Sequence, residues 1–200
     1  NKAEGPDAKG GGIYFENSSK PGYYDFFIFL NDGKVLKNIS EQHGGGIYVY
    51  EGDVSYDETI DGGKLEINNN KAINGAGIFI QNGDLSIRNG DITENKIEES
   101  GNGAGVHINN GEMTLVNGSI MSNTIAATGN GGGIYIENGD FTIHSGNISS
   151  NTLNNGNGGG IYIYDASGVN IRNTSKIEDC EARLAGGGIY QRKGTLTISG

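Results

Sequence analysis

Acidic residues recur at one kind of position in this chain, directly after a glycine that opens a tight turn. They are Asp53, Asp84, Glu112 and Asp140. If equivalent turns stack on one another, these carboxylates lie close together and repel. Calcium takes several oxygen ligands and could relieve that repulsion, although the chelating spacing of known calcium loops is missing. We therefore favour carboxylates that point into water and expect no metal or other cofactor, with calcium at these four positions as the alternative.

A second set of residues lies where the chain carries extra length between otherwise regular segments. In the first repeat, 23 residues separate the last glycine of Gly-Gly-Gly, Gly12, from Val35 in the expected third strand. In the second repeat, 19 residues separate Gly46 from Leu65. Three later repeats need only 15 residues. Insertions on one side of a repeat protein are common ligand-binding loops. The candidate binding residues there are Tyr23, Tyr24, Asp25, Tyr56, Asp57, Glu58 and Asp61.

The same insertions have a structural alternative, because a first repeat must cover its own open edge. No Arg, Lys or His accompanies the inserted acids, so we assign no catalytic residue. The three histidines, His43, His107 and His144, fall at different repeat positions. A three-histidine metal site is therefore not expected.

An aromatic residue follows the recurring Gly-Gly-Gly-Ile motif in nearly every copy. The positions are Tyr14, Tyr48, Phe79, His107, Tyr135, Tyr162 and Tyr190. We expect an outward-facing stripe that could stack on sugars or pack against a partner, with one side of each ring left open by the neighbouring glycines. The alternative, which we favour, is mutual stacking that stabilises the sheet by roughly 0.5–1 kcal/mol per pair.

The elements that position these side chains follow from the repeat itself. Seven motif copies are separated by steps of 34, 31, 28, 28, 27 and 28 residues, a period typical of solenoids. Within the repeat from Gly133, short apolar-alternating segments are separated by glycine- and asparagine-rich corners. This predicts an all-β, right-handed parallel β-helix of about seven coils with three short strands per coil. It forms one domain over 1–200, with 1–45 as a first coil that carries a capping or insertion segment.

An asparagine stands three residues after the apolar residue of each expected third strand. These positions are Asn38, Asn68, Asn95, Asn123 and Asn151, with Cys180 in the sixth repeat. Identical amides in register can donate and accept along the stack, which predicts a structural asparagine ladder at one corner.

The composition restricts the partners. A formal net charge of −10 disfavours nucleic acid and anionic membrane surfaces. No apolar run approaches the ~20 residues that cross a bilayer. The single cysteine excludes an internal disulfide.

The Gly-Gly-Gly-Ile and Ile-x-x-Asn motifs resemble the Gly-Gly-Ala-Ile and Phe-x-x-Asn repeats of chlamydial polymorphic membrane proteins. Gly/Asn-rich β-helix surface proteins of other bacteria, including autotransporter passengers, are similar over essentially the whole chain. The resemblance implies an extracellular or cell-surface stalk or adhesin without enzymatic activity. Its partner would be a glycan or protein on a host or neighbouring cell. The alternative is a carbohydrate-active enzyme, a polysaccharide lyase or hydrolase, or a glycan-binding β-helix.

The last repeat ends at Gly200 without an Ile-x-x-Asn segment. We therefore expect a fragment of a longer array, or an end covered by another chain. Exposed strand edges would favour end-to-end or edge self-association.

Overall fold

The computed structural model describes residues 1–16, 27–29, 33–56 and 64–200. Most of the candidate binding residues in the insertions lie outside these ranges: Tyr23, Tyr24, Asp25, Asp57, Glu58 and Asp61. Tyr56 is described as the last residue of a strand, where its backbone pairs in register with Ile87. Their proposed role in binding therefore stays a prediction.

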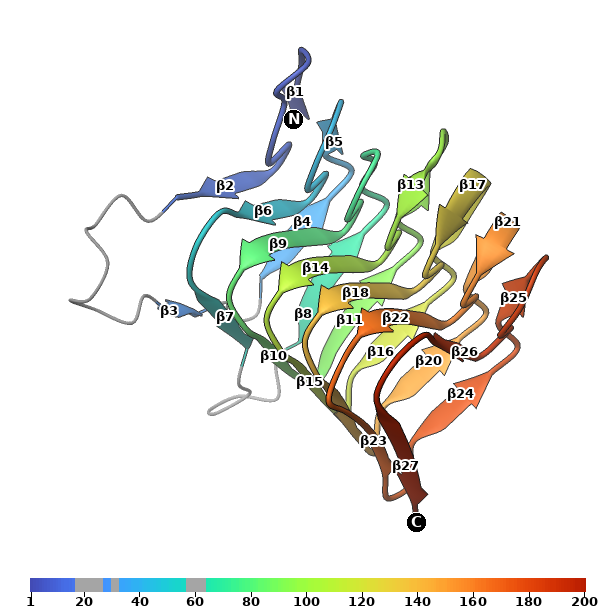
Figure 1. Cartoon of the computed structure of the whole chain (residues 1–200). Coiled ribbons are helices and arrows are strands. Elements are labelled where there is room, and N and C mark those ends of the chain that lie inside the picture. Colours follow the sequence, from blue (N-terminus) through green and yellow to red (C-terminus); the bar gives the residue numbers. More distant parts are fainter. Residues whose placement is uncertain (17–26, 30–32, 57–63) are drawn as a thin grey trace.

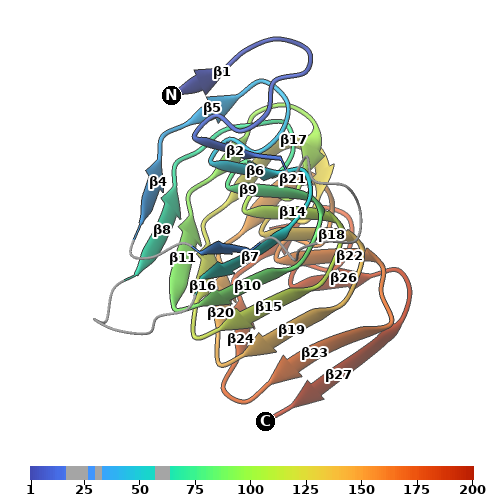
Figure 2. The same cartoon turned by 90° about the vertical axis from the view of Figure 1, so that its left-hand side faces the viewer.

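The chain winds into a solenoid of about six turns in which every paired strand is parallel (Figures 1 and 2). The prediction of an all-β parallel β-helix is confirmed. Each turn contributes one strand to each stacked sheet, so neighbouring turns are joined by continuous hydrogen-bond ladders. Among the described residues, no helix is long and apolar enough to cross a membrane.

Three long sheets, here called I, II and III, form the faces of the solenoid. Sheet I contains β2 (Ile13–Phe15), β6 (Ile47–Val49), β9 (Ile78–Asn82), β14 (Val106–Asn110), β18 (Ile134–Asn138), β22 (Ile161–Asp165) and β26 (Ile189–Gln191). Sheet II contains β3 (Phe27–Phe29), β7 (Asp53–Tyr56), β10 (Leu85–Arg88), β15 (Met113–Val116), β19 (Phe141–His144), β23 (Gly168–Arg172) and β27 (Thr195–Ser199). Sheet III contains β4 (Lys34–Leu36), β8 (Leu65–Asn68), β11 (Gly90–Thr93), β16 (Ser119–Met121), β20 (Asn147–Ser149) and β24 (Lys176–Glu178).

A fourth sheet, IV, is an addition to the three strands per coil that the sequence predicts. It contains β12 (Lys96–Ile97), β17 (Thr124–Asn130), β21 (Thr152–Asn157) and β25 (Glu181–Ala182), with β13 (Gly101–Asn102) also paired to β17. At the N-terminal end, β1 (Lys2–Ala3) pairs with β5 (Ile39–Ser40), and bridges through Lys71 connect β5 to β12. These strands project from one corner of the solenoid as a row of arms (Figure 1).

The core is a set of aliphatic ladders inside the solenoid. In the turn that begins at Gly133, Ile134, Ile136, Phe141, Ile143 and Ile148 are fully buried. Their equivalents pair in register in the neighbouring turns, as the alternating pattern predicts. Each such side chain contributes on the order of 1.5–3 kcal/mol by leaving water, so the regular ladders account for a stable core in a chain of low overall hydrophobicity.

The asparagine ladder exists, but one of its predicted members is wrong. Ile67, rather than Leu65, pairs with Ile92, and Asn70 takes the ladder position that we assigned to Asn68. Asn68 instead lies in β8 and donates to the Thr93 hydroxyl at 3.0 Å. The ladder members are therefore Asn38, Asn70, Asn95, Asn123 and Asn151.

Each buried ladder amide is fully used, which explains why asparagine is needed at this corner. Asn95 Nδ2 donates to Asn123 Oδ1 and to the Ile67 carbonyl, both at 3.0 Å. The Asn95 backbone N–H donates to the same Oδ1 at 3.0 Å. In the sixth turn, Asn151 Nδ2 contacts Cys180 Sγ at 3.8 Å, so the thiol occupies the last ladder position. Burial raises the pKa of the Cys180 thiol.

The Gly-x-Gly segment is required because the next turn passes directly beneath it. A Cβ on Gly105 would lie 2.6 Å from the Gly133 carbonyl oxygen and 3.1 Å from Asn123 Nδ2. The first glycine of the motif has a different reason, since Gly103 adopts a φ of 63°, a conformation that side chains disfavour. The motif thus fixes both the approach of neighbouring turns and the bend from sheet IV into sheet I.

Candidate binding groove

The predicted aromatic stripe is a continuous stack along the outer side of sheet I. Ring centroids of successive members are 4.6–5.4 Å apart from Tyr14 to Tyr190. Our expectation that one side of each ring stays open is wrong for the five central members. Tyr48, Phe79, His107, Tyr135 and Tyr162 are at most 8% exposed, because each ring covers the faces of its neighbours. The stack therefore stabilises the sheet, and its central rings are not accessible to a ligand.

The acidic column serves the backbone of the next turn. Asp53 Oδ1 accepts from the Asp84 N–H at 2.8 Å, and Asp84 Oδ1 accepts from the Glu112 N–H at 2.7 Å. Asp140 Oδ1 accepts from the N–H groups of Ser167 and Gly168 at 2.7 and 2.9 Å. One carboxylate oxygen of Asp53, of Asp84 and of Asp140 is thus engaged in capping the next turn. In the part of the chain that the structure describes, no three or more His, Cys, Asp or Glu residues group as metal ligands.

The turns also differ in the length of the arm that projects from one corner. We define an arm as the segment between the ladder Asn or Cys and the first glycine of the next Gly-x-Gly. The six arms, 39–43, 71–74, 96–102, 124–130, 152–157 and 181–185, contain five, four, seven, seven, six and five residues. Because the backbone registers at both ends of an arm are fixed, a longer arm must project farther. The four-residue arm 71–74 therefore leaves a depression beside the seven-residue arm 96–102.

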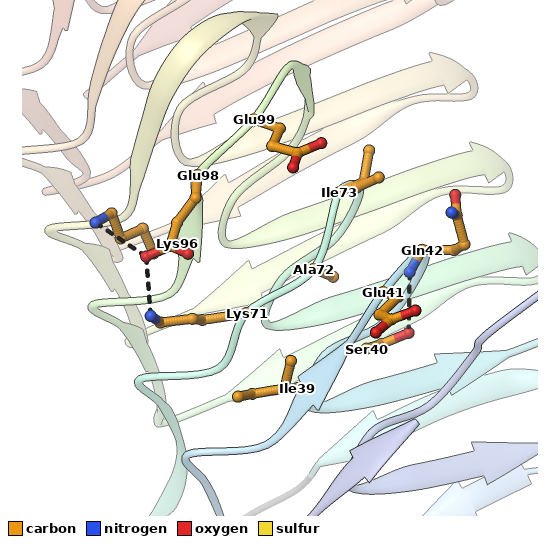
Figure 3. A pocket seen from close by; sticks show the side chains of 10 residues that line it. All are labelled: Ile39, Ser40, Glu41, Gln42, Lys71, Ala72, Ile73, Lys96, Glu98 and Glu99. Atoms are coloured by element: carbon orange, nitrogen blue, oxygen red, sulfur yellow. Dashed lines mark hydrogen bonds and ion pairs between the residues drawn. The ribbon is translucent and has the colours of Figure 1, made fainter. Parts of the chain in front are cut away.

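This depression is a groove of about 480 Å³ (Figure 3). It is lined by Ile39, Ser40, Glu41, Gln42, Lys71, Ala72, Ile73, Lys96, Glu98 and Glu99. Ala72 and Ile73 form its floor, between Glu41 and Gln42 at one end and the Lys71, Lys96 and Glu98 cluster at the other. These ten residues form the groove.

The charges of the groove are organised around Glu98. Lys71 Nζ lies 2.9 Å and Lys96 Nζ 3.3 Å from Glu98 Oε1. Hydrogen bonds from Lys71 and Lys96 lower the pKa of the Glu98 carboxyl. All three side chains are about half exposed, so the pairs contribute at most about 1 kcal/mol to stability. The two ion pairs hold two cations and one anion in fixed positions at one end of the groove.

The opposite end is acidic and is tied to the N-terminal segment. Glu41 Oε2 accepts from the Gly5 N–H at 2.7 Å, and Lys2 Nζ lies 3.4 Å from Glu41 Oε1. The Gly5 hydrogen bond, with the help of Lys2, lowers the pKa of the Glu41 carboxyl. A ligand in the groove therefore meets an apolar floor with cationic and anionic groups at its ends, and its volume falls within the ~300–1,000 Å³ of small-ligand sites.

The sequence did not reveal this groove, and the ladder error explains why. With Asn68 as the ladder residue, the second arm would be residues 69–74, six residues and unremarkable. With Asn70, it is 71–74 and the shortest of all. A second amide column was also missed: Asn74, Asn102, Asn130 and Asn157 bond along the base of the arms. The Asn directly before four of the seven Gly-x-Gly motifs was the available signal.

Comparison with known proteins agrees with the geometry. The family model described as right handed beta helix region matches residues 11–200, and the chain belongs to this family. The right-handed winding predicted from crossover rules is thereby confirmed. No curated protein and no solved structure matches the chain.

Proposed function

We propose that this protein is a non-enzymatic extracellular or cell-surface scaffold, of the stalk or adhesin type, that binds a partner through the groove. The partner is a glycan or a protein on a host or neighbouring cell. The observation that carries the proposal is the short arm 71–74, which interrupts a row of longer arms and creates the groove. Solenoids commonly vary loop length at the side where they bind.

The ladders support a scaffold role. The buried amides bond to the equivalent amides of the next turn, the rings stack on the equivalent rings, and the capping carboxylates accept backbone N–H groups of the next turn. Such a rod holds its shape without a ligand, so a surface feature of a few turns is presented in a fixed geometry. The motif resemblance to Gly/Asn-rich bacterial surface proteins points in the same direction.

The test is binding of the purified chain to glycan and protein arrays, with variants of the groove. Lys71→Ala removes one cation beside Glu98, and Glu99→Lys reverses a wall charge. Both variants should lose at least one array partner that the wild type binds, while keeping the thermal stability of the wild type. Lys34→Ala is the matched control, because Lys34 makes an equivalent exposed pair with Glu66 at 2.9 Å on sheet III. Equal binding by the wild type and both groove variants would contradict the proposal.

A second candidate function, a polysaccharide hydrolase or lyase, is favoured by one observation. Three carboxylates, Glu41, Glu98 and Glu99, line the same groove, and glycoside hydrolysis uses a pair of them. Release of reducing ends or unsaturated products from a polysaccharide panel, lost in Glu99→Gln, would establish the enzyme. Binding of a polysaccharide without release of such products would favour the non-enzymatic scaffold over the enzyme.

A further inference from the structure

The outer side of sheet I carries a second column of side chains beside the buried aromatic stack. It runs one position beyond the core residue of each strand, through Tyr50, Gln81, Asn109, Glu137, Tyr164 and Arg192. The strand registers fix this alignment, because Val49, Ile80, Ile108, Ile136, Ile163 and Gln191 are paired in sequence. The strands that carry the column lie side by side in Figure 1. We call this column the outer column.

Two aromatic side chains of the outer column are open to solvent, unlike the central rings of the stack. Tyr50 is 40% and Tyr164 is 36% exposed. Near Tyr50, Tyr14 is 46% exposed and donates its hydroxyl hydrogen bond to Glu16 at 2.8 Å. The Arg192 guanidinium lies 4.2 Å from the centre of the Tyr164 ring, which holds that ring in place. The column therefore presents two exposed rings, and Arg192 holds the one of Tyr164.

The middle of the outer column is polar and fixed. Asn109 Nδ2 donates to Gln81 Oε1 at 3.0 Å, and Asn109 Oδ1 contacts His107 Nε2 at 2.7 Å. These contacts hold the carbonyl side of Gln81, so its amide nitrogen has its two N–H groups available as donors. Between the two tyrosines the chain thus offers amide donors and the Glu137 carboxylate on a rigid sheet.

The distance between the aromatic ends defines the length of a ligand that would use both. Tyr50 and Tyr164 are four strands apart in sheet I, which is roughly 19 Å at about 4.8 Å per strand. Rings at both ends with hydrogen-bond donors between them match a chain of sugar rings, which offers apolar ring faces and hydroxyl groups along its length. Glu137 in the column and Glu16 in the neighbouring turn, next to Tyr50 in register, outnumber Arg192. The chain also has a net charge of −10, so a polyanionic glycan would be repelled.

We propose that the outer column binds a linear, neutral, extended glycan, such as a β-1,4-linked oligosaccharide, lying along the axis of the solenoid, with sugar rings against Tyr50 and Tyr164. This surface lies on sheet I and is independent of the groove between the arms. Binding to the outer column requires a ligand that is long enough to reach both tyrosines. Binding in the groove does not require a ligand of that length.

Calorimetric titration of the full chain with cellohexaose, chitohexaose and their disaccharides tests the proposal. At least one hexasaccharide should bind, and at least tenfold more tightly than its disaccharide, because only the longer ligand reaches both rings. Tyr50→Ala and Tyr164→Ala should each weaken hexasaccharide binding about two- to tenfold, and the double variant should lose it. Tyr50→Phe and Tyr164→Phe keep the rings and should keep most of the affinity.

The controls separate this surface from the groove and from unfolding. Leu184→Ala changes an apolar residue that is 65% exposed elsewhere and should bind like the wild type. Lys71→Ala in the groove should also leave hexasaccharide binding unchanged, so that failure of either proposal is recognised separately. The proposal is overturned if neither hexasaccharide binds, if disaccharides bind as tightly, if only polyanionic glycans bind, or if the folded double alanine variant still binds.

Discussion

Protonation of His107 should be a principal cause of instability of this protein in mild acid. His107 is 5% exposed and stacks between Phe79 at 4.6 Å and Tyr135 at 4.7 Å. Burial lowers the pKa of its imidazole to about 4, against opposing contributions from its contacts with Asn109 and Asn102. Above pH 6.5 the imidazole is neutral in both the folded and the unfolded chain, and the stability of the stack is fully present.

The magnitude follows from the two pKa values of the imidazole. Between pH 6.5 and about 4 the unfolded chain takes up the proton and the folded chain does not, so stability falls as the pH is lowered. From pH 7.5 to pH 4.5 the loss is about 2 to 3 kcal/mol from this residue alone. Burial also lowers the pKa of His43, so its contribution has the same sign.

The assay is urea unfolding at pH 7.5 and pH 4.5 for the wild type and for His107→Phe. Phenylalanine occupies the equivalent position in the preceding turn, at Phe79, so the stack should accept it. The wild type should lose about 2 to 3 kcal/mol more than the variant between the two pH values. Equal losses in both proteins would show that the buried imidazole does not control acid stability, and would refute the reasoning.

Three further substitutions test the ladders and corners by thermal or urea unfolding. Asn123→Leu should destabilise by about 1–3 kcal/mol by leaving buried backbone groups unpaired, whereas Asn68→Leu, outside the ladder, should cost under about 1 kcal/mol. Gly105→Ala should destabilise severely because its Cβ would lie 2.6 Å from a carbonyl oxygen, while Gly168→Ala, with no atom closer than 3.6 Å, should be nearly neutral. Lys37→Asn should stabilise by about 0.5–1 kcal/mol, since Lys37 has a φ of 56° that asparagine tolerates better. No loss in Asn123→Leu, equal effects of the two glycine variants, or a destabilised Lys37→Asn would each contradict the corresponding assignment.

The sequence was sufficient for the fold because each turn repeats one strong anchor. Gly-x-Gly admits the neighbouring backbone, and the alternating Ile residues after it can only be buried on one face of a strand. These local requirements recur seven times at nearly constant spacing, so they place the sheet I strand of every turn. The members of the aromatic stack follow the Gly-x-Gly motif by two residues, so their positions were predicted from the same repeat.

The register of the second turn could not be fixed from the same pattern. Leu65 and Asn68 match the spacing of the ladder motif, and so do Ile67 and Asn70. Only the stacking of Asn70 on Asn95, with its hydrogen bond of 3.0 Å, distinguishes the two. The choice moves two residues from the arm to the preceding insertion, which lengthens from 19 to 21 residues between Gly46 and Ile67.

Accessibility of the aromatic side chains was the other property that local sequence did not reveal. Tyr48 and Tyr50 are two residues apart and face the same side of sheet I, yet they are 2% and 40% exposed. The difference arises because Tyr48 lies between the rings of Tyr14 and Phe79. It depends on contacts across three turns, which no single repeat contains.

The most direct test of the groove as a binding site is to fill it without altering any ladder. Residues 71–74 are replaced by the sequence of arm 124–130, Thr-Ile-Ala-Ala-Thr-Gly-Asn, which stacks beside a seven-residue arm in the wild type. Binding to the glycan and protein arrays is then measured for both chains, with thermal unfolding as the control. We predict that the filled variant folds with wild-type stability and loses the array partner. Undiminished binding by the folded variant would contradict the central claim.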